Sequence, residues 1–382
     1  MFPRIPWKDV CWTNSSFLIS TLVLTLTAVP WYLWRFGLSW FQGILFLLFF
    51  IATGLSITLG YHRLFSHFSF RASWPVKLFT LLFGAAAFEN SALSWSADHR
   101  RHHKFVDDDG DPYNINKGFF HAHMGWIMFK VRTATVENVP DLLRDRLVMW
   151  QHNNYVSIAV CVSFLLPALI GYAWGGAQVA LGSLLIAGIA RVVFVQHMTF
   201  FINSLCHTLG SRPYSSRCTA RDSALMAVFT FGEGYHNFHH EFQYDYRNGV
   251  KPWQFDPTKW SIWLLEKVGL AAQLRRVPTE RIMLAEIAEK QRQMDQRLAD
   301  GKFTLPAPWG VRLQNAQQQL HHAVEIWEQK KTEYTRCVEQ KWEESRQKVA
   351  ALKQEMELAS ERLRTAIEHW QEEHRLAQAA LV

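Results

Sequence analysis

Four long apolar stretches constrain the fold of this 382-residue chain more than any other feature of its sequence. A helix needs about 20 predominantly apolar residues to cross the hydrocarbon core of a bilayer. The stretches run over residues 17–34, 40–59, 156–174 and 179–201. We therefore expect an all-α integral membrane protein with four transmembrane helices, because helices satisfy all their backbone hydrogen bonds internally.

The loops that join these stretches predict two hairpins and an orientation. Residues 35–39 close the first hairpin and residues 175–178 the second, and Arg35 is the lone basic residue in either loop. Lys and Arg are plentiful before the first stretch, between the second and third, and after the fourth. The positive-inside rule then places both termini and the central segment in the cytoplasm. We expect a multi-pass membrane protein, in the inner membrane if the source is bacterial.

Two further segments bear on this topology. The first 14 residues lack a small-residue cleavage site, so we interpret the first stretch as a retained span and not as a signal peptide. A fifth apolar run, residues 74–93, is interrupted by Glu89 and Asn90. We expect it to form a buried or interfacial helix.

Three histidine clusters supply the chemistry. Two of them repeat the spacing H-x-x-H-H, and positions i, i+3 and i+4 share one face of a helix. Neutral imidazole is a preferred ligand of iron, zinc and copper. Because the clusters follow the ends of apolar stretches on the predicted cytoplasmic side, they can form one site. Their members are His62 and His67; His99, His102 and His103; and His236, His239 and His240.

The number of histidines favours two metal ions. His207 brings the set to nine, whereas one transition ion takes about four to six ligands. Asn203 precedes His207 by one helical turn, where it can hold a water on the metal. Metal-bound histidine usually donates its second N–H to a carboxylate. We expect Asp98 and Glu233 in that outer role, while the run 107–109 is equally compatible with surface or cap positions.

This arrangement indicates an oxidative reaction on an amphipathic substrate. Iron with nitrogen ligands can activate O₂ for attack on an unactivated C–H bond. A site at the ends of membrane helices suits a substrate whose tail enters an apolar slot and whose polar head stays at the cytoplasmic face. The net charge of +7 fits a basic face against lipid headgroups or an acidic carrier, and no nucleic-acid partner is expected.

The sequence changes character near residue 279, so we predict two domains, residues 1–278 and 279–382. The second is charged, with Leu313, Leu320, Trp327 and Tyr334 recurring every seven residues before the phase slips at Trp342. This pattern predicts a long amphipathic helix or coiled coil with a stutter. It allows pairing with a second copy, folding back as a hairpin, or lying on the membrane. Its histidines lie outside the three histidine clusters and are expected to be solvated. They are His321, His322, His369 and His374.

The three histidine clusters, called boxes from here on, resemble those of the membrane fatty acyl desaturases. The resemblance is greatest to the Δ9, stearoyl-CoA type and covers roughly residues 40–275. The matching segments are GYHRLFSH at 60–67, WSADHRRHHKF at 95–105, DPYN at 111–114, NS at 203–204 with His207, and GEGYHNFHH at 232–240. The resemblance implies a non-haem di-iron enzyme that uses O₂ and two electrons. It implies that the nine histidines bind iron, that Asn203 binds through water, and that Trp95 lines the acyl tunnel. Electrons would come from an external ferredoxin- or cytochrome b5-like donor.

The chain departs from the animal acyl-CoA enzymes at three places, one of which is Phe200, where those enzymes tend to have Trp. Ala97 replaces an Arg, and Asn116 with Lys117 replaces a basic pair, which leaves Lys117 as the candidate contact for the acyl carrier. An acyl-lipid substrate is therefore an alternative to acyl-CoA, which we favour.

The predicted function is an oxygen-dependent desaturase that introduces a cis double bond, at Δ9, into a saturated C16–C18 acyl chain. A fatty acyl or alkyl hydroxylase of the same superfamily shares the site chemistry and is the first alternative. A non-enzymatic membrane metal carrier is the second, although carriers place their ligands near the bilayer midplane.

Overall fold

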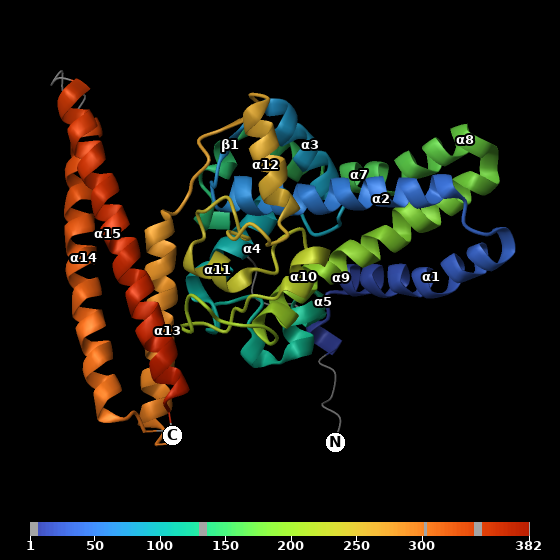
Figure 1. The fold of residues 1–382 in the computed structure, drawn as a ribbon. Coiled ribbons are helices and arrows are strands. Elements are labelled where there is room, and N and C mark those ends of the chain that lie inside the picture. The colour runs from blue at the N-terminus through green and yellow to red at the C-terminus, as the bar shows by residue number, and fades with distance from the viewer. Residues whose placement is uncertain (1–6, 130–135, 302–303, 340–345, 382) are drawn as a thin grey trace. The chain divides into compact units, whose positions relative to one another are not determined.

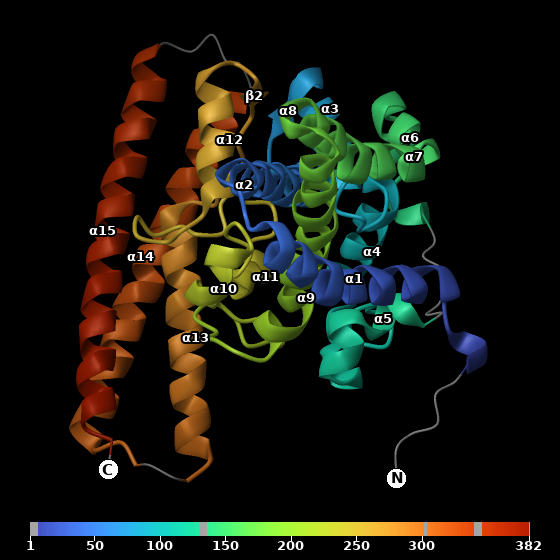
Figure 2. The same ribbon diagram turned by 90° about the vertical axis from the view of Figure 1, so that its right-hand side faces the viewer.

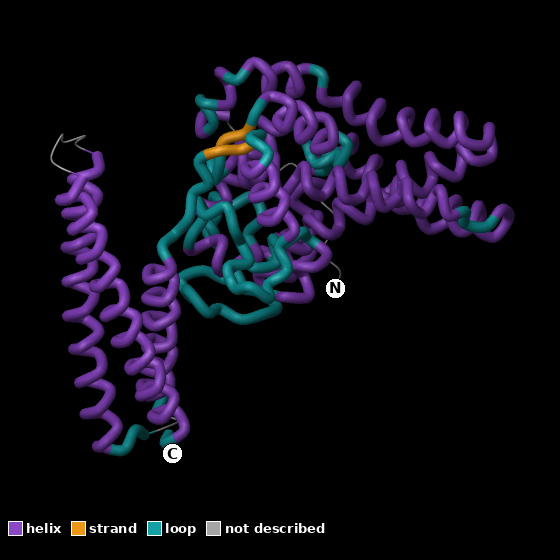
Figure 3. The backbone as a smooth tube through the Cα atoms, turned by 45° about the horizontal axis from the view of Figure 1, so that its top comes forward, coloured by secondary structure: helices purple, strands orange, loops and turns teal. Residues whose placement is uncertain are grey.

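The computed structural model describes residues 7–129, 136–301, 304–339 and 346–381. In these ranges the elements of regular secondary structure are helices, apart from one antiparallel pair of two-residue strands, β1 (Arg71–Ala72) and β2 (Ala271–Ala272) (Figure 3). The expectation of an all-α fold is confirmed. Contacts divide the chain into two compact units, one of Met1–Arg212 with Ser216–Arg276 and one of Pro213–Ser215 with Val277–Val382. The boundary near residue 277 lies close to the predicted one, and the independence of the two domains stays a prediction.

Two apolar helices begin the first unit. They are α1 (Trp12–Phe36) and α2 (Trp40–Leu55), and α2 continues without a break into the wider turns of η2 (Ser56–Ser66) (Figure 1). A tight connection joins them: Ser39 caps α2 by accepting from the backbone N–H of Gln42, and the Gln42 side chain accepts from the N–H of Ser39. Both helices, Trp12–Phe36 and Trp40–Ser66, are long and apolar enough to cross a membrane.

The third apolar helix of that length, Tyr155–His207, folds back on itself. It comprises α7 (Tyr155–Val160), η7 (Cys161–Leu165), α8 (Leu166–Ser183), η8 (Leu184–Ala190), α9 (Arg191–Ser204) and η9 (Leu205–His207). Its direction reverses at Gly175 and Gly176, where Gly176 has φ 75°, a backbone conformation that glycine adopts without strain (Figure 1). The reversal coincides with the short loop predicted between the third and fourth apolar stretches.

The remaining helices of the first unit carry or support the histidines. The apolar run after residue 74 forms α3 (Trp74–Ala85), too short to be a span by the same measure. Buried Tyr61, Leu81, Leu93 and Ile262 belong to one core cluster that ties η2 to α3, α4 and α12. The other elements are η1 (Trp7–Asp9), α4 (Ala92–Phe105), η3 (Ile115–Lys117), η4 (His121–Gly125), α5 (Trp126–Met128), η5 (Val136–Asn138), η6 (Leu142–Arg144), α6 (Arg146–Asn153), α10 (Ala224–Phe229), α11 (His236–Glu241) and α12 (Pro257–Lys267).

The second unit consists of three helices, α13 (Thr279–Ala299), α14 (Ala307–Glu339) and α15 (Arg346–Ala379). The last two lie side by side (Figure 2) and run antiparallel, because ion pairs join residue 312 to 373 and residue 330 to 355. Leu320, Trp327, Leu363 and Trp370 fill the core between the helices. Of the three arrangements that the heptads allow, the structure has the hairpin.

Two expectations about this tail need correction. The two heptad phases belong to two antiparallel helices and not to one continuous helix, and Trp342, where we placed the stutter, lies outside the described residues. His374 is buried, with its ring stacked on Trp370 at 4.6 Å between centroids, so the expectation that it is solvated was wrong. A histidine at a buried helical position packs like an aromatic residue, and the sequence gives no sign of that by itself.

Candidate metal centre

Four segments of the first unit bring the nine box histidines together. His62 lies on η2 and His67 directly follows it, whereas the second box lies on α4 and the third on α11. His207 ends η9. The H-x-x-H-H spacing is helical in both triplets, as predicted, so each triplet presents its three imidazoles on one side of its helix.

The imidazoles converge as two groups, each with ring nitrogens within 4.8 Å of one another. The first group contains His62, His67, His99, His103 and His239, and the second contains His102, His207, His236 and His240. All nine rings approach another ring of the set through Nε2. The Nε2 atoms of His67 and His99 are 2.8 Å apart and those of His207 and His236 are 3.1 Å apart. Nitrogen lone pairs at such distances repel one another, and a cation placed among them replaces that repulsion by attraction.

For most of these imidazoles, burial favours the neutral form that metal binding needs. It is the largest cause that lowers the pKa values of six of them, and the neighbouring imidazoles lower them further. The six are His67, His99, His103, His236, His239 and His240. A neutral ring whose Nε2 lone pair faces the centre carries its proton on Nδ1, so Nδ1 needs an acceptor elsewhere.

Three such acceptors are present. Nδ1 of His62 lies 2.8 Å from Oε2 of Glu233, and Nδ1 of His102 lies 2.9 Å from Oδ1 of Asp111. The Nδ1 of His207 donates to the hydroxyl of Thr219 at 2.7 Å, and Thr219 donates in turn to Asp107 at 2.6 Å. Each contact fixes a ring orientation and makes its Nε2 more basic.

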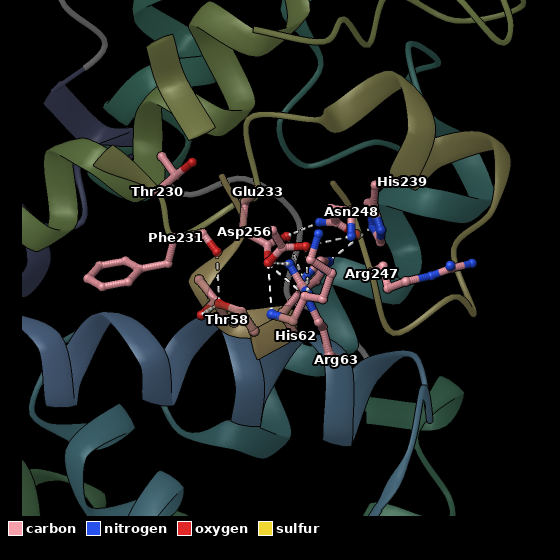
Figure 4. Close-up of polar contacts among 12 residues, drawn as sticks. Thr58, His62, Arg63, Thr230, Phe231, Glu233, His239, Arg247, Asn248 and Asp256 are labelled. Atoms are coloured by element: carbon pink, nitrogen blue, oxygen red, sulfur yellow. Dashed lines mark hydrogen bonds and ion pairs between the residues drawn. The ribbon is translucent and has the colours of Figure 1, made fainter. Parts of the chain in front are cut away.

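Glu233 also belongs to a buried ionic network beside His62 (Figure 4). Arg63 donates from Nη2 to Glu233 at 3.0 Å and to Asp256 at 3.1 Å, and Asn248 donates to the second oxygen of Glu233 at 2.7 Å. Burial alone would raise the pKa of Glu233, but His62 and Arg63 hold it below its ordinary value. The carboxylate is therefore ionised. Through Arg63, the network ties η2 to the loop before α11 and to Asp256 at the N-terminus of α12.

Asp98 and Glu233, the two carboxylates predicted to accept the second N–H of a box histidine, differ in where they lie. Glu233 contacts a box imidazole, whereas no hydrogen bond joins Asp98 to any of the nine rings in the described part of the chain. Asp98 lines a neighbouring cavity instead, where burial raises its pKa to about 6. Two residues that sequence reasoning missed take the outer positions, Asp111 and Thr219. Burial would raise the pKa of Asp111, but His102 and two backbone N–H groups lower it.

A signal for one of the two was present. Asp111 lies nine residues after His102 in an Asp-Pro turn, where an Asp side chain commonly accepts backbone N–H groups, as it does here from Tyr113 at 2.9 Å. It belongs to the DPYN segment that follows the second box, but Asp98 is next to His99 in the sequence and was the residue predicted. Thr219 lies 12 residues after His207 and carries no such mark.

An apolar cavity of about 980 Å³ opens against all three boxes. Side chains of α1, α7 and α9, among them Phe17, Val160 and Phe200, form its wall, and His62, His99 and His236 line it as well. Trp95 lies between the two regions: it lines the cavity and stacks on His99 with ring centroids 4.8 Å apart.

Asn203 and Lys117 were also predicted to serve this site. Asn203 lines the same cavity as His236 of the second group, and its role in holding a water stays a prediction. Lys117 is exposed and lies outside the cavity lining, 3.9 Å from Asp109.

The residues present fit a pair of transition-metal ions. Two sets of imidazoles, five and four in number, point their Nε2 atoms inward, and the Nδ1 partners are carboxylates or a hydroxyl. A structural zinc site closes with four ligands, so the larger set indicates a site with open positions. The arrangement can bind redox metals beside a large apolar cavity.

Comparison with known proteins yields consistent matches. A family model described as fatty acid desaturase matches residues 38–263. Acyl-CoA desaturase 1 of Saccharomyces cerevisiae is 40% identical over 304 residues, which cover 77% of this chain and 58% of the relative. The probable acyl-CoA desaturase of Schizosaccharomyces pombe is 38% identical over 314 residues, 81% of this chain and 64% of the relative. Stearoyl-CoA desaturase 5 of Bos taurus is 33% identical over 290 residues, 72% of this chain and 82% of the relative. The chain thus spans less than two thirds of the length of the two fungal relatives.

Proposed function

Because this chain belongs to the fatty acid desaturase family, we propose that it is an oxygen-dependent di-iron desaturase of saturated fatty acyl chains. The observation that carries the proposal is the convergence of nine imidazoles, in groups of five and four, at the wall of an apolar cavity. The product is a cis double bond, at Δ9, in a C16–C18 chain. The overall reaction takes two hydrogen atoms from the chain and, with two electrons and two protons, reduces O₂ to two water molecules.

The roles of the residues follow from their contacts. Two iron ions held by the nine histidines would supply the activation of O₂ and the removal of hydrogen from an unactivated C–H bond. Glu233, Asp111 and Thr219 orient the rings through Nδ1, and Asn203 holds a water. Trp95 lines the apolar cavity and stacks on His99, so it would position the acyl chain against the reacting face.

Acyl-CoA is the carrier that we favour over acyl-lipid. The relatives from two fungi and from Bos taurus carry acyl-CoA or stearoyl-CoA in their names. Lys117, exposed near the second box, is the cation that would meet an acidic carrier group outside the cavity.

We place the protein in a membrane with four spans, both termini and the histidines on the cytoplasmic side. Leu26, Leu48 and Leu169 are each more than half exposed on the apolar helices, which suits contact with lipid. Trp34, Trp40 and Trp174 are exposed near the two hairpin turns, as expected of aromatic residues at a membrane interface. The charged cap with the second and third boxes then faces the cytoplasm.

Residues 1–278 would form the desaturase domain and residues 279–382 a helical extension. An external ferredoxin- or cytochrome b5-like protein would supply the electrons. Self-association through the extension would need a surface other than the heptad positions Leu320, Trp327 and Leu363, because the antiparallel helices bury them.

Expression in a host that lacks monounsaturated fatty acids tests the proposal. We expect C16 and C18 monoenes in the host lipids, measured by gas chromatography, together with two irons per purified chain. A hydroxy fatty acid without a monoene would overturn desaturation in favour of the hydroxylase. Two bound irons with unaltered acyl chains, in the presence of reductant and O₂, would favour a metal carrier.

A further inference from the structure

Glu89 occupies a strained loop between α3 and α4. Both of its neighbours have positive φ angles, 56° at Phe88 and 86° at Asn90. Residues other than glycine adopt this region rarely, and such strain persists where the surroundings hold the backbone in place. The loop therefore presents the Glu89 side chain in one defined direction, into the cavity beside the boxes, which Glu89 lines.

Side chains from the long apolar helix anchor this loop. Arg191 donates from Nη1 to the carbonyl of Ala86 at 2.7 Å, and Ser163 donates to the same carbonyl at 2.6 Å. Gln196 donates to the carbonyl of Phe88 at 2.9 Å. Three polar side chains of η7 and α9 thus donate hydrogen bonds to the backbone around Glu89. In the described part of the chain, none of them donates to its carboxyl group.

Few polar interactions compensate for the burial of the Glu89 carboxyl group. Both oxygens are buried, and neither makes a well-formed hydrogen bond within the described residues. Thr199 and Trp95 are the nearby donors, and their weak interactions oppose the effect of burial, which raises the pKa of Glu89 to about 8. The carboxyl group is therefore mostly protonated at pH 7. It is a neutral acid in an apolar pocket.

The other charged and titratable groups around Glu89 do not offer a second neutral carboxylic acid of this kind. Tyr155 on α7, Tyr61 on η2 and Tyr113 are the titratable side chains that feel its charge. Asp98 and Glu233 are the other carboxyl groups of the cavity, and Glu233 is bonded to Arg63 and Asn248. Of the three, Glu89 has both oxygens buried without full hydrogen bonds.

A polar path leads from Glu89 to the histidines. Thr199 and Asn203 lie one turn apart on α9, so their side chains share a face, and both line the cavity with Glu89. The Thr199 hydroxyl can accept a proton and donate another. Asn90, next in the chain, is exposed, so the other end of the path meets solvent.

We infer that Glu89 delivers protons from solvent to the histidine side of the apolar cavity during O₂ reduction. The protons pass through the Thr199 hydroxyl and the water expected at Asn203. The inference rests on the proposed desaturation. There, –CH₂–CH₂– + O₂ + 2 e⁻ + 2 H⁺ gives –CH=CH– + 2 H₂O, with the electrons from the external protein donor. Each proton leaves a Glu89 carboxyl oxygen and ends on an oxygen atom that departs as water. The carboxylate takes up the next proton from solvent at Asn90.

The decisive variant is Glu89→Gln, which keeps the shape and neutrality of the side chain but carries no transferable acid proton. We expect kcat to fall about 100-fold, the usual scale of general acid catalysis, with KM for the acyl substrate and iron content unchanged. Wild-type activity should decline as pH rises through about 8, and the variant should lose that decline. Thr199→Val, which removes one hydroxyl, should also lower kcat. Glu137→Gln, the same change at an exposed site, should match the wild type.

An infrared difference spectrum of wild type minus Glu89→Gln provides a readout independent of turnover. It should show the C=O stretch of a protonated carboxylic acid that disappears as pH rises through about 8. A carboxylate band at pH 7, or a variant with full kcat and the same alkaline decline, would overturn the inference. If the wild type makes no monoene, desaturation fails by itself, while the infrared band still reports whether Glu89 is a neutral acid.

Discussion

Nδ1 of His62 lies 2.8 Å from Oε2 of Glu233, and both side chains are almost completely buried. The contact joins a candidate metal ligand to a carboxylate that other groups already hold in place. Arg63 and Asn248 donate to that carboxylate, and neither belongs to the metal centre itself. The position of the His62 ring is therefore set by a network that exists whether or not metal is bound, which is how an outer carboxylate pre-organises a ligand.

Replacing Glu233 by Gln should weaken metal binding without removing any ligand. The amide keeps the shape but loses the charge that stabilises the Nδ1–H of His62 and balances Arg63. We expect iron affinity or activity to fall roughly 10- to 100-fold, the range seen for outer-sphere substitutions. Competition with a chelator, followed by iron analysis, measures the effect, and Glu137→Gln at an exposed position serves as the control. Unchanged iron retention would show that Glu233 matters only for folding.

Each group of histidines should fail when one ring is removed. His102→Ala takes a ligand from the second group and His239→Ala from the first, so we expect either change to abolish desaturation while membrane insertion is kept. Iron analysis should find fewer than two ions per chain. His321→Ala and His369→Ala, at exposed positions of the tail, should stay near wild type. Full turnover in His102→Ala or His239→Ala would remove that residue from the ligand set.

The convergence of the boxes was predictable because helical spacing and position along the chain are local properties. H-x-x-H-H places three rings on one face of a helix wherever the helix lies, and box positions at the ends of apolar stretches put them on one predicted side. The turn between the third and fourth stretches was predictable in the same way, since Gly175 and Gly176 interrupt an otherwise apolar run.

The hydrogen-bond partners of the histidines were harder to predict from the sequence, because they depend on loop geometry. Asp98 precedes His99 in sequence, but successive residues of a helix point in different directions, so its carboxyl group turns toward the cavity. Asp111 returns to His102 only through the turn that follows α4, and Thr219 reaches His207 from a segment 12 residues away. Glu89 interrupted an apolar run in the sequence, and only the folded chain shows that it faces the boxes.

The metal-free protein should lose stability as the pH falls below about 6.5, the pKa of an unfolded histidine. Six buried imidazoles have lowered pKa values, so below that pH the unfolded chain binds more protons than the folded one, and stability falls. Above it both states are neutral at these groups, and they add no pH dependence. Thermal midpoints in detergent between pH 8 and pH 5 measure the trend. His103→Gln should make the acid slope shallower, and His369→Gln should leave it unchanged. Equal slopes in all three proteins would contradict this assignment.

The helical extension should depend on Trp327, which is 3% exposed and donates from Nε1 to the hydroxyl of Ser360 at 3.0 Å. Trp327→Ala removes that bond and opens a cavity between α14 and α15, a change that costs about 3–5 kcal/mol in buried cores. We expect faster proteolysis within residues 279–382, measured by limited digestion, with unchanged iron content and monoene formation. Val311→Ala, at a position 59% exposed, should digest like the wild type. Loss of monoenes in Trp327→Ala despite full iron content would mean that the extension takes part in the reaction, for example by receiving the electron donor.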